Sequence, residues 1–269
     1  MIRKILNFFK SLFKKCGKLN SITIGKTQVW YGREGQWNTN LKLLSKELDV
    51  MEKYGVSGYI IEMAGASPYK WTDKWAKEIE EAYKYLLSEC RARNMWLHVS
   101  IANDNLGKGK YGDAGKRNIA SEMARFKQFC KIVKDNGPKN VVVQPVAETQ
   151  TNGGKTFETY CKNELKGFLT CYNGNGGHPS GTNGMTYYAI HPAKISAKNP
   201  QNALVISDHG QLIRELNQGR ALYKHGDPAQ ITTWVKNNKA IGVPVVGYYA
   251  FEITDLDEGA IKALGKAIK

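Results

Sequence analysis

Several features that would place a protein in a simple class are missing from this sequence. Its 5 cysteines are odd in number and scattered, and none of them forms a C-x-x-C pair. Neither a disulfide framework nor a cysteine-ligated zinc site is expected, and the thiols indicate folding in a reducing compartment. The histidines show no H-x-H or H-E-x-x-H spacing, so we expect no catalytic metal.

Motifs that bind phosphates or carry a nucleophile are missing as well. The glycines after the first predicted strand do not match a dinucleotide fingerprint, and there is no Walker sequence. No serine or cysteine lies in a nucleophile-elbow sequence. These absences disfavour nucleotide-dependent enzymes and serine or cysteine hydrolases, and the sequence predicts no cofactor.

Acidic residues are scarce relative to basic ones. The chain of 269 residues has 24 Asp and Glu against 39 Lys and Arg, which gives a formal net charge of +15. Such an excess favours a polyanionic partner, such as nucleic acid, anionic lipid or an acidic cell-wall polymer. No arginine-rich reading helix, zinc-finger spacing or ribonucleoprotein motif is found, so nucleic acid is not the favoured partner.

From residue 20 onward, strand and helix signals alternate along the chain. Strands buried on both faces of a parallel sheet are continuously apolar, whereas helices repeat their apolar residues with a period near 3.6. The predicted strands are residues 27–32, 57–63, 95–102, 141–149, 167–172, 185–191, 203–208 and 243–251. The predicted helices are residues 40–54, 72–93, 117–135, 157–165, 228–240 and 258–268.

Eight strands that alternate with helices over about 240 residues match an α/β fold, the (β/α)8 TIM barrel. A doubly wound open sheet is the competing fold, but it usually needs fewer strands and a phosphate loop after the first one. We therefore predict a single barrel domain over residues 20–269.

Residues 1–19 form a separate segment, which we call the leader. Apolar residues recur in it at helical spacing, and it has six cations and no acid. Lys10 interrupts its apolar centre and no cleavage site follows, so no cleavable signal peptide is recognised. We predict a basic amphipathic helix that lies on an anionic membrane; a helix that plugs the bottom of the barrel is the alternative. The expected localisation is cytoplasmic or peripheral at a membrane.

The predicted strand at residues 141–149, VVVQPVAET, supplies the first candidate catalytic residue. Its apolar start indicates a barrel strand, and its carboxylate Glu148 lies near the end, directly before the sequence TQTNGG. In (β/α)8 enzymes the residues that end the strands form the catalytic rim. Glu148 is therefore either a catalytic group or a rim glutamate that caps a helix or contacts only solvent.

The ends of the other predicted strands converge on the same rim, where Asp208 and Arg33 also lie. Rim carboxylates with aromatic neighbours suit glycoside hydrolysis, in which one carboxyl group protonates the leaving oxygen and another attacks or activates water. The predicted substrate-binding residues are Tyr31, Glu62, Asn103, Tyr172, His191, His209, Tyr249, Phe251 and Glu252.

This arrangement resembles the cellulase-like clan A superfamily of (β/α)8 glycoside hydrolases, to which family 5 belongs. Those enzymes have an acid/base glutamate at the end of strand four and a nucleophilic glutamate at the end of strand seven. Glu148 in QPVAET matches the first position, and Asp208 in VISDHG lies where the second is expected. The resemblance implies a barrel glycosidase with Glu148 and Asp208 as its catalytic pair.

Further matches and departures bear on the same resemblance. His191 matches a strand-six histidine, and Tyr248, Tyr249 or Phe251 matches the aromatic platform of strand eight. The family usually has asparagine directly before the acid/base, where this chain has Ala147. The sequence thus leaves two functions open. The first is an active glycosidase with a carbohydrate substrate, such as a lysin that cleaves an envelope glycan. The second is a non-catalytic glycan-binding or structural protein.

Overall fold

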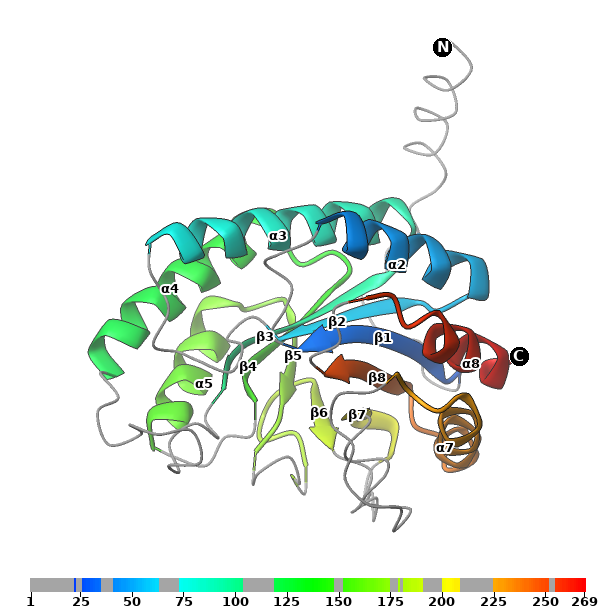
Figure 1. Cartoon of the computed structure of the whole chain (residues 1–269). Coiled ribbons are helices and arrows are strands. Elements are labelled where there is room, and N and C mark those ends of the chain that lie inside the picture. Colours follow the sequence, from blue (N-terminus) through cyan, green and yellow to red (C-terminus); the bar gives the residue numbers. More distant parts are fainter. Residues whose placement is uncertain are drawn as a thin grey trace, which may run out of the picture.

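The computed structural model describes residues 22, 26–34, 41–62, 73–103, 119–147, 152–174, 179, 181–190, 200–208, 225–251 and 255–269. Eight parallel strands close into a barrel in which each strand pairs with the next and β1 pairs with β8 (Figure 1). The strands are β1 (Gln28–Glu34), β2 (Gly58–Glu62), β3 (Trp96–Asn103), β4 (Val141–Ala147), β5 (Leu169–Tyr172), β6 (Tyr187–Ile190), β7 (Ala203–Asp208) and β8 (Val245–Phe251).

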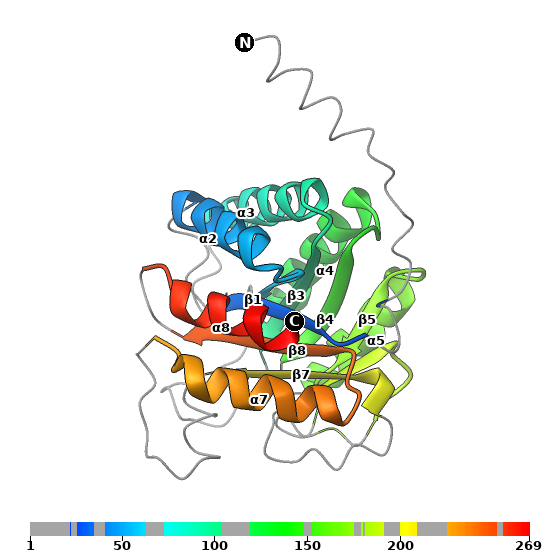
Figure 2. The same ribbon diagram turned by 90° about the vertical axis from the view of Figure 1, so that its right-hand side faces the viewer.

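Helices cover the outside of the barrel, and the (β/α)8 prediction is confirmed. In both views α7 (Pro228–Ala240) and α8 (Glu258–Ile268) lie side by side, and α7 contacts β8 while α8 contacts β1 (Figures 1 and 2). The short 3-10 helix η5 (Pro200–Asn202) lies between β6 and β7. The described α-helices are α2 (Leu41–Tyr54), α3 (Asp73–Ala92), α4 (Ile119–Asn136), α5 (Asn152–Glu164), α7 (Pro228–Ala240) and α8 (Glu258–Ile268).

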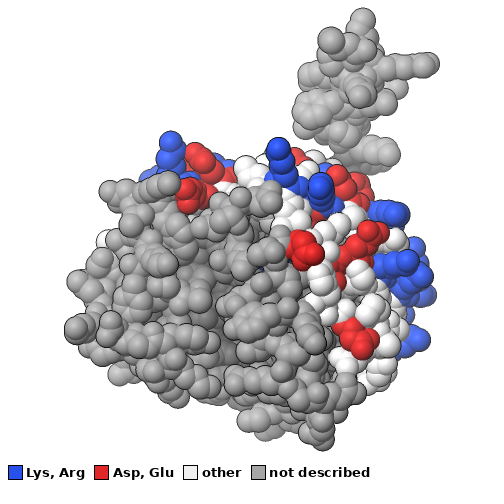
Figure 3. Space-filling model, in the orientation of Figure 1, with Lys and Arg blue, Asp and Glu red and all other residues white. Residues whose placement is uncertain are grey.

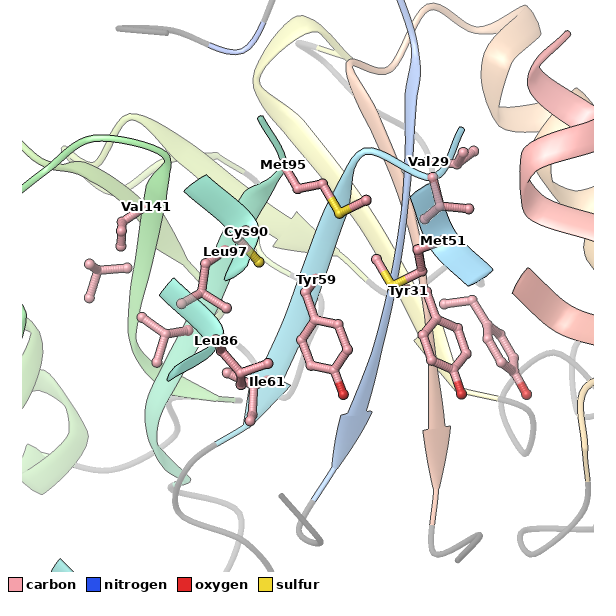
Figure 4. Packing of buried hydrophobic residues seen from close by; sticks show 14 of the residues in the cluster. Val29, Tyr31, Met51, Tyr59, Ile61, Leu86, Cys90, Met95, Leu97 and Val141 are labelled. Atoms are coloured by element: carbon pink, nitrogen blue, oxygen red, sulfur yellow. The ribbon is translucent and has the colours of Figure 1, made fainter. Parts of the chain in front are cut away.

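Two clusters of buried apolar residues lie on the two sides of the barrel wall. Trp30, Ile60, Trp96 and Leu204 belong to the interior cluster, which fills the barrel. The outer cluster fills the layer between strands and helices, where the side chains of β1, β2 and β3 meet those of α2 and α3 (Figure 4). Successive residues of a strand point to opposite sides, so the alternation between these clusters tells which positions face the interior.

The N-terminal end of the barrel is closed by Ile22. This side chain is fully buried in the interior cluster, and its backbone N–H donates to the Tyr187 hydroxyl at the start of β6, 3.2 Å away. The predicted leader, residues 1–19, lies outside the described residues, so neither its membrane role nor its plug alternative is tested.

The described cysteines agree with the prediction of free thiols. Cys90, Cys130, Cys161 and Cys171 are all unpaired by disulfide and buried, where a reduced cysteine acts as a small apolar side chain. Among the helices that the structure describes, none is long and apolar enough to cross a membrane.

Candidate active site

The candidate catalytic rim is the end of the barrel at which the strands terminate. Ala147 is the last residue of β4 and is buried, so the predicted acid/base Glu148 follows directly after that strand. Glu148 itself lies outside the described residues, as do His191, His209 and Glu252.

Asp208 is the last residue of β7. Leu204 and Ile206 of the same strand belong to the interior cluster, and Asp208 follows in the same two-residue phase. Its register partner is Tyr249 of β8, which is partly buried and packs against the interior cluster. The backbone therefore brings a predicted catalytic residue and a predicted aromatic platform to neighbouring positions.

A further acidic position, Glu34, was missed by reasoning from the sequence. The first strand was expected to end at Gly32, but β1 continues to Glu34, in phase with the interior residue Trp30. In the barrel register, Glu34 pairs with Glu62 at the end of β2 and with Phe251 at the end of β8. The two-residue spacing of Trp30, Gly32 and Glu34 along β1 is the sequence signal for this position.

Tyr31 and Arg33 do not reach the rim, and their predicted place there is wrong. Tyr31 is 0% exposed in the outer cluster, because odd-numbered residues of β1 face the helices. Its hydroxyl donates to Glu47 of α2 (3.2 Å), as do the Tyr59 hydroxyl (3.0 Å) and Arg33 Nε (2.7 Å). We call these four side chains the Glu47 cluster, and it joins β1 and β2 to α2.

Burial and pairing shift the titration of the Glu47 cluster in different directions. Burial raises the pKa of Glu47, while the hydrogen bond and charge of Arg33 oppose this shift. Burial alone would lower the pKa of Arg33, but the hydrogen bond and charge of Glu47 raise it. The guanidinium group is therefore held protonated, and its ion pair with Glu47 (2.6 Å) is closed to solvent.

Two other aromatic candidates face the helix layer. Tyr172 packs against the outer cluster, and burial together with the charge of Glu158 raises its pKa. A sugar could touch only the exposed edge of Tyr172, so its substrate contact stays a prediction. Tyr248 is 0% exposed in the outer cluster, 6.3 Å from the ring of Tyr31, and is excluded as a sugar platform.

Asn103 ends β3 beside the predicted acid/base. Its register partner is Ala147, the residue that stands where the family has asparagine. The asparagine of this chain, Asn103, thus lies on the strand next to the one on which the family has its asparagine.

Polar side chains are buried inside the barrel below the rim. His98 lies 6.2 Å from the Trp30 ring, and the Gln144 amide nitrogen donates to the Ser100 hydroxyl (3.1 Å). Among the described residues, neither imidazole nitrogen of His98 nor the Gln144 side-chain oxygen has a partner at hydrogen-bonding distance. Burial lowers the pKa of His98 to about 4, against a weak opposing effect of the nearby Gln144. His98 is therefore neutral at physiological pH.

No metal centre can be built from the residues that the structure describes, because no three His, Cys, Asp or Glu side chains gather in a suitable group. The carboxyl-bearing residues that end described strands are Glu34, Glu62 and Asp208.

Comparisons by sequence give no relative: no protein-family model matches the chain, and no curated protein matches it. Comparison by structure does. A family 5 glycoside hydrolase of Prevotella bryantii B14 superposes with a TM-score of 0.56 at 10% identity, over 94% of this chain and 99% of that one. A mutant of that enzyme in complex with a xyloglucan tetradecasaccharide gives 0.51 at 10% identity, over 95% of this chain and 99% of that one.

A family 5 glycoside hydrolase of Bacteroides vulgatus ATCC 8482 superposes with a TM-score of 0.54 at 11% identity, over 82% of this chain. The matched chain spans 57% of the Bacteroides enzyme's length. These likenesses confirm the predicted resemblance to the clan A barrels at the level of the fold: this chain has the fold of the family 5 glycoside hydrolases.

Proposed function

We propose that this protein is a glycoside hydrolase that cleaves a poly- or oligosaccharide with Glu148 and Asp208. The supporting observation is the strand order of the barrel, in which Asp208 is the last residue of β7 and Glu148 directly follows the last residue of β4. Strands four and seven are the two that carry the catalytic glutamates in clan A. Glu148 acts as general acid/base and Asp208 as nucleophile or as the base that activates water.

The substrate class follows from the residues beside Asp208. Tyr249 packs against the interior cluster and Phe251 lies two residues further along β8, and aromatic rings at the end of a barrel strand suit stacking on sugar rings. The Prevotella enzyme with the same fold binds a xyloglucan oligosaccharide. The net charge of +15 favours an acidic envelope glycan as the target, as for a lysin.

Two departures from the family bear on the mechanism. Aspartate at position 208 is one methylene shorter than glutamate, and retaining enzymes hold their carboxyl groups about 5–5.5 Å apart whereas inverting ones need about 6.5–9.5 Å. The shorter side chain favours the wider gap. Asn103 is proposed to supply the amide that the family places before its acid/base, because it pairs with Ala147.

The assignment is tested by Glu148→Gln, with Glu258→Gln on the exposed start of α8 as the matched control. Glu148→Gln removes the proton donor and should lower the rate of hydrolysis by at least about a hundredfold. Folding and sugar binding should stay nearly intact, and the control should keep full activity. A Glu148→Gln variant as fast as the parent would contradict the assignment.

The same assay identifies the second catalytic carboxylate by the loss of hydrolysis rate in each variant. Asp208→Asn should lower the rate as strongly as Glu148→Gln, whereas Glu34→Gln, Glu62→Gln and Glu252→Gln should have smaller effects on the maximal rate. If Glu252→Gln abolishes hydrolysis and Asp208→Asn does not, the role of the second carboxylate moves to Glu252.

The second candidate function is a non-catalytic glycan-binding or structural protein on the same scaffold. Ala147 and Asp208, which stand where the family has asparagine and glutamate, favour this candidate. Fold alone does not decide between the two. Binding of a glycan without release of reducing ends would support this second function.

The leader is proposed to bind anionic membranes, because its six cations accompany an apolar helical stripe. Deletion of residues 1–19 should leave activity on small soluble glycosides unchanged and should sharply reduce liposome binding. This reduction should be larger at low salt, where screening is weak. If the deletion unfolds the protein, the leader is instead a plug of the barrel.

A further inference from the structure

The end of the barrel opposite the rim carries a concentration of positive charge. Helices run antiparallel to the strands here, so helix ends and strand starts share one end, on the right in Figure 1, which we call the basal face. Every described α-helix has a cation in its last turn. These cations are Lys53, Arg91, Lys134, Lys162, Lys239 and Lys266.

One cation at a helix end is explained by the helix dipole alone. The basal face has more, because Lys26, Lys139, Lys166 and Lys269 lie outside these last turns and at the same end. Across the basal face, cations outnumber acids by more than two to one, whereas in the preceding turns of the same helices the two kinds nearly balance. Lys and Arg side chains line the right-hand edge of Figure 3, where Figure 1 places the ends of α2 and α8.

The acids of the basal face are already paired. Glu52 and Glu89 lie 3.6 and 2.5 Å from Arg93, and Glu164 lies 3.2 Å from Lys134. Asp135 pairs with Lys131 at 2.5 Å. They therefore neutralise little of the remaining positive charge.

The cations that remain are exposed lysines. The ion pairs found among the described residues do not include Lys26, Lys53, Lys166 or Lys266, and these four side chains are exposed. The arginines are used internally: Arg91 donates to the backbone oxygens of residues 136, 137 and 139, and Arg93 holds the acids named above. Lysines act as point charges without the planar fork of arginine, which suits charge attraction to an array of phosphates rather than recognition of one group.

The leader joins the folded chain at the same end. Ile22 is buried in the interior cluster and its backbone N–H donates to the hydroxyl of Tyr187 at the start of β6, so residue 22, which follows the leader in the sequence, lies at the basal end of the barrel.

We propose that the basal face docks on an anionic lipid surface, so that the candidate active site points away from the membrane. The partner is a bilayer with exposed anionic headgroups. Its planar negative charge complements lysines spread over a whole end of the barrel. Docking does not depend on the proposed glycosidase activity, because it uses residues at the opposite end.

The test is sedimentation of the full chain with phosphatidylcholine vesicles that contain or lack phosphatidylserine. The basal variant carries Lys26→Gln, Lys53→Gln, Lys166→Gln and Lys266→Gln. The matched control removes the same number of exposed lysines from the helix bodies, at Lys42, Lys77, Lys84 and Lys155. Circular dichroism melts check that both variants fold like the parent.

Binding of the parent should require phosphatidylserine. The basal variant should bind these vesicles at least about tenfold more weakly, and the control should lose far less, because lipid contact and not net charge sets the affinity. Equal losses in the two variants would overturn the proposal, since only total charge would then matter. No phosphatidylserine-dependent binding of the parent, or full binding of the basal variant, would overturn it as well.

Discussion

Buried polar groups are hydrogen-bonded to different extents in two regions of the molecule. These regions are the layer between the barrel and the helices, and the interior of the barrel. In the outer layer, Glu47 is fully buried but receives hydrogen bonds from Arg33, Tyr31 and Tyr59. In the interior, the His98 imidazole has no hydrogen-bond partner among the described residues, and Gln144 uses only its amide nitrogen. A satisfied polar cluster fixes one packing, whereas an incompletely satisfied one costs stability.

This difference indicates a structural role for the outer layer and a functional role for the interior below the rim. The Glu47 cluster ties the first two strands to α2 and is closed to solvent, which is a structural role. The interior polar groups lie directly below the proposed catalytic rim, where polar groups that reduce stability are commonly retained. The variants below test whether this contrast holds, from the largest expected effect to the smallest.

Removing the carboxylate acceptor of the Glu47 cluster should have the largest effect on stability. Glu47→Ala leaves Arg33 buried without its carboxylate and should lower the free energy of unfolding by about 3–5 kcal/mol. Asp49→Ala on the same helix removes an exposed partner of Arg93 and should cost less than about 1 kcal/mol. Urea unfolding measures both, and similar small losses would show that the Glu47 cluster does not hold the layer together.

Acid should act on the interior through His98. The pKa of this residue is about 4 in the folded chain against 6.5 as its ordinary value, so the unfolded chain binds more protons between these pH values. The stability that neutral His98 provides above pH 6.5 is therefore lost as the pH falls towards 4. The full loss is about 3 kcal/mol.

His98→Gln should remove this part of the pH dependence. The raised pKa of Glu47 acts in the opposite direction, because the folded state there favours the protonated form, but it is common to both proteins and cancels in the comparison. Thermal unfolding of parent and His98→Gln between neutral and acid pH gives the measurement. Parallel curves for the two proteins would show that His98 does not titrate on unfolding.

Close packing of the outer layer can be tested at α8. A Cβ added to Gly265 would lie 2.1 Å from the backbone oxygen of Tyr54 at the end of α2, so Gly265→Ala must push two helices apart. We expect a loss of about 1–3 kcal/mol. Gly259→Ala on the same helix meets its nearest atom only at 3.7 Å and should be neutral or slightly stabilising. Equal melting temperatures of the two variants would contradict the tight contact.

The sequence predicts the elements best where local chemistry marks their ends. The helix at residues 228–240 and the strand at residues 203–208 are found with the predicted bounds. For this helix the reason is visible, since Asp227 caps its first turn by accepting from the backbone N–H groups of residues 229 and 230, and Pro228 occupies the first helical position.

Glycine was a misleading end signal in the first strand. The sequence predicts that the strand ends at Gly32, but this residue lies within β1, where an added Cβ would meet the backbone oxygen of Ile60 at 1.8 Å. Glycine is required there by the close approach of two strands, a tertiary contact that sequence does not reveal. Gly167 behaves differently, since its φ of 88° belongs to a turn and β5 begins after it, at Leu169.

The candidate site was predicted less well than the fold because both faces of these strands are apolar. The sequence of β1 does not show by itself that Trp30 faces the interior and that Tyr31 faces the helices. Tyr31 and Arg33 were therefore assigned to the wrong side and Glu34 was overlooked. In β7 the last residue is Asp208, as predicted, while its place in the site and its catalytic role stay predictions.

The central claim, that this barrel is a glycosidase, is tested most directly by the release of reducing ends. Purified parent and Glu148→Gln should be incubated with peptidoglycan, chitin, β-glucans including xyloglucan, and β-mannans, with binding to each measured in parallel. We predict that the parent releases reducing ends from at least one of these glycans, while Glu148→Gln binds the same glycan and releases none. Binding by the parent without any release of reducing ends, across the whole panel, would contradict the claim and favour the non-catalytic function.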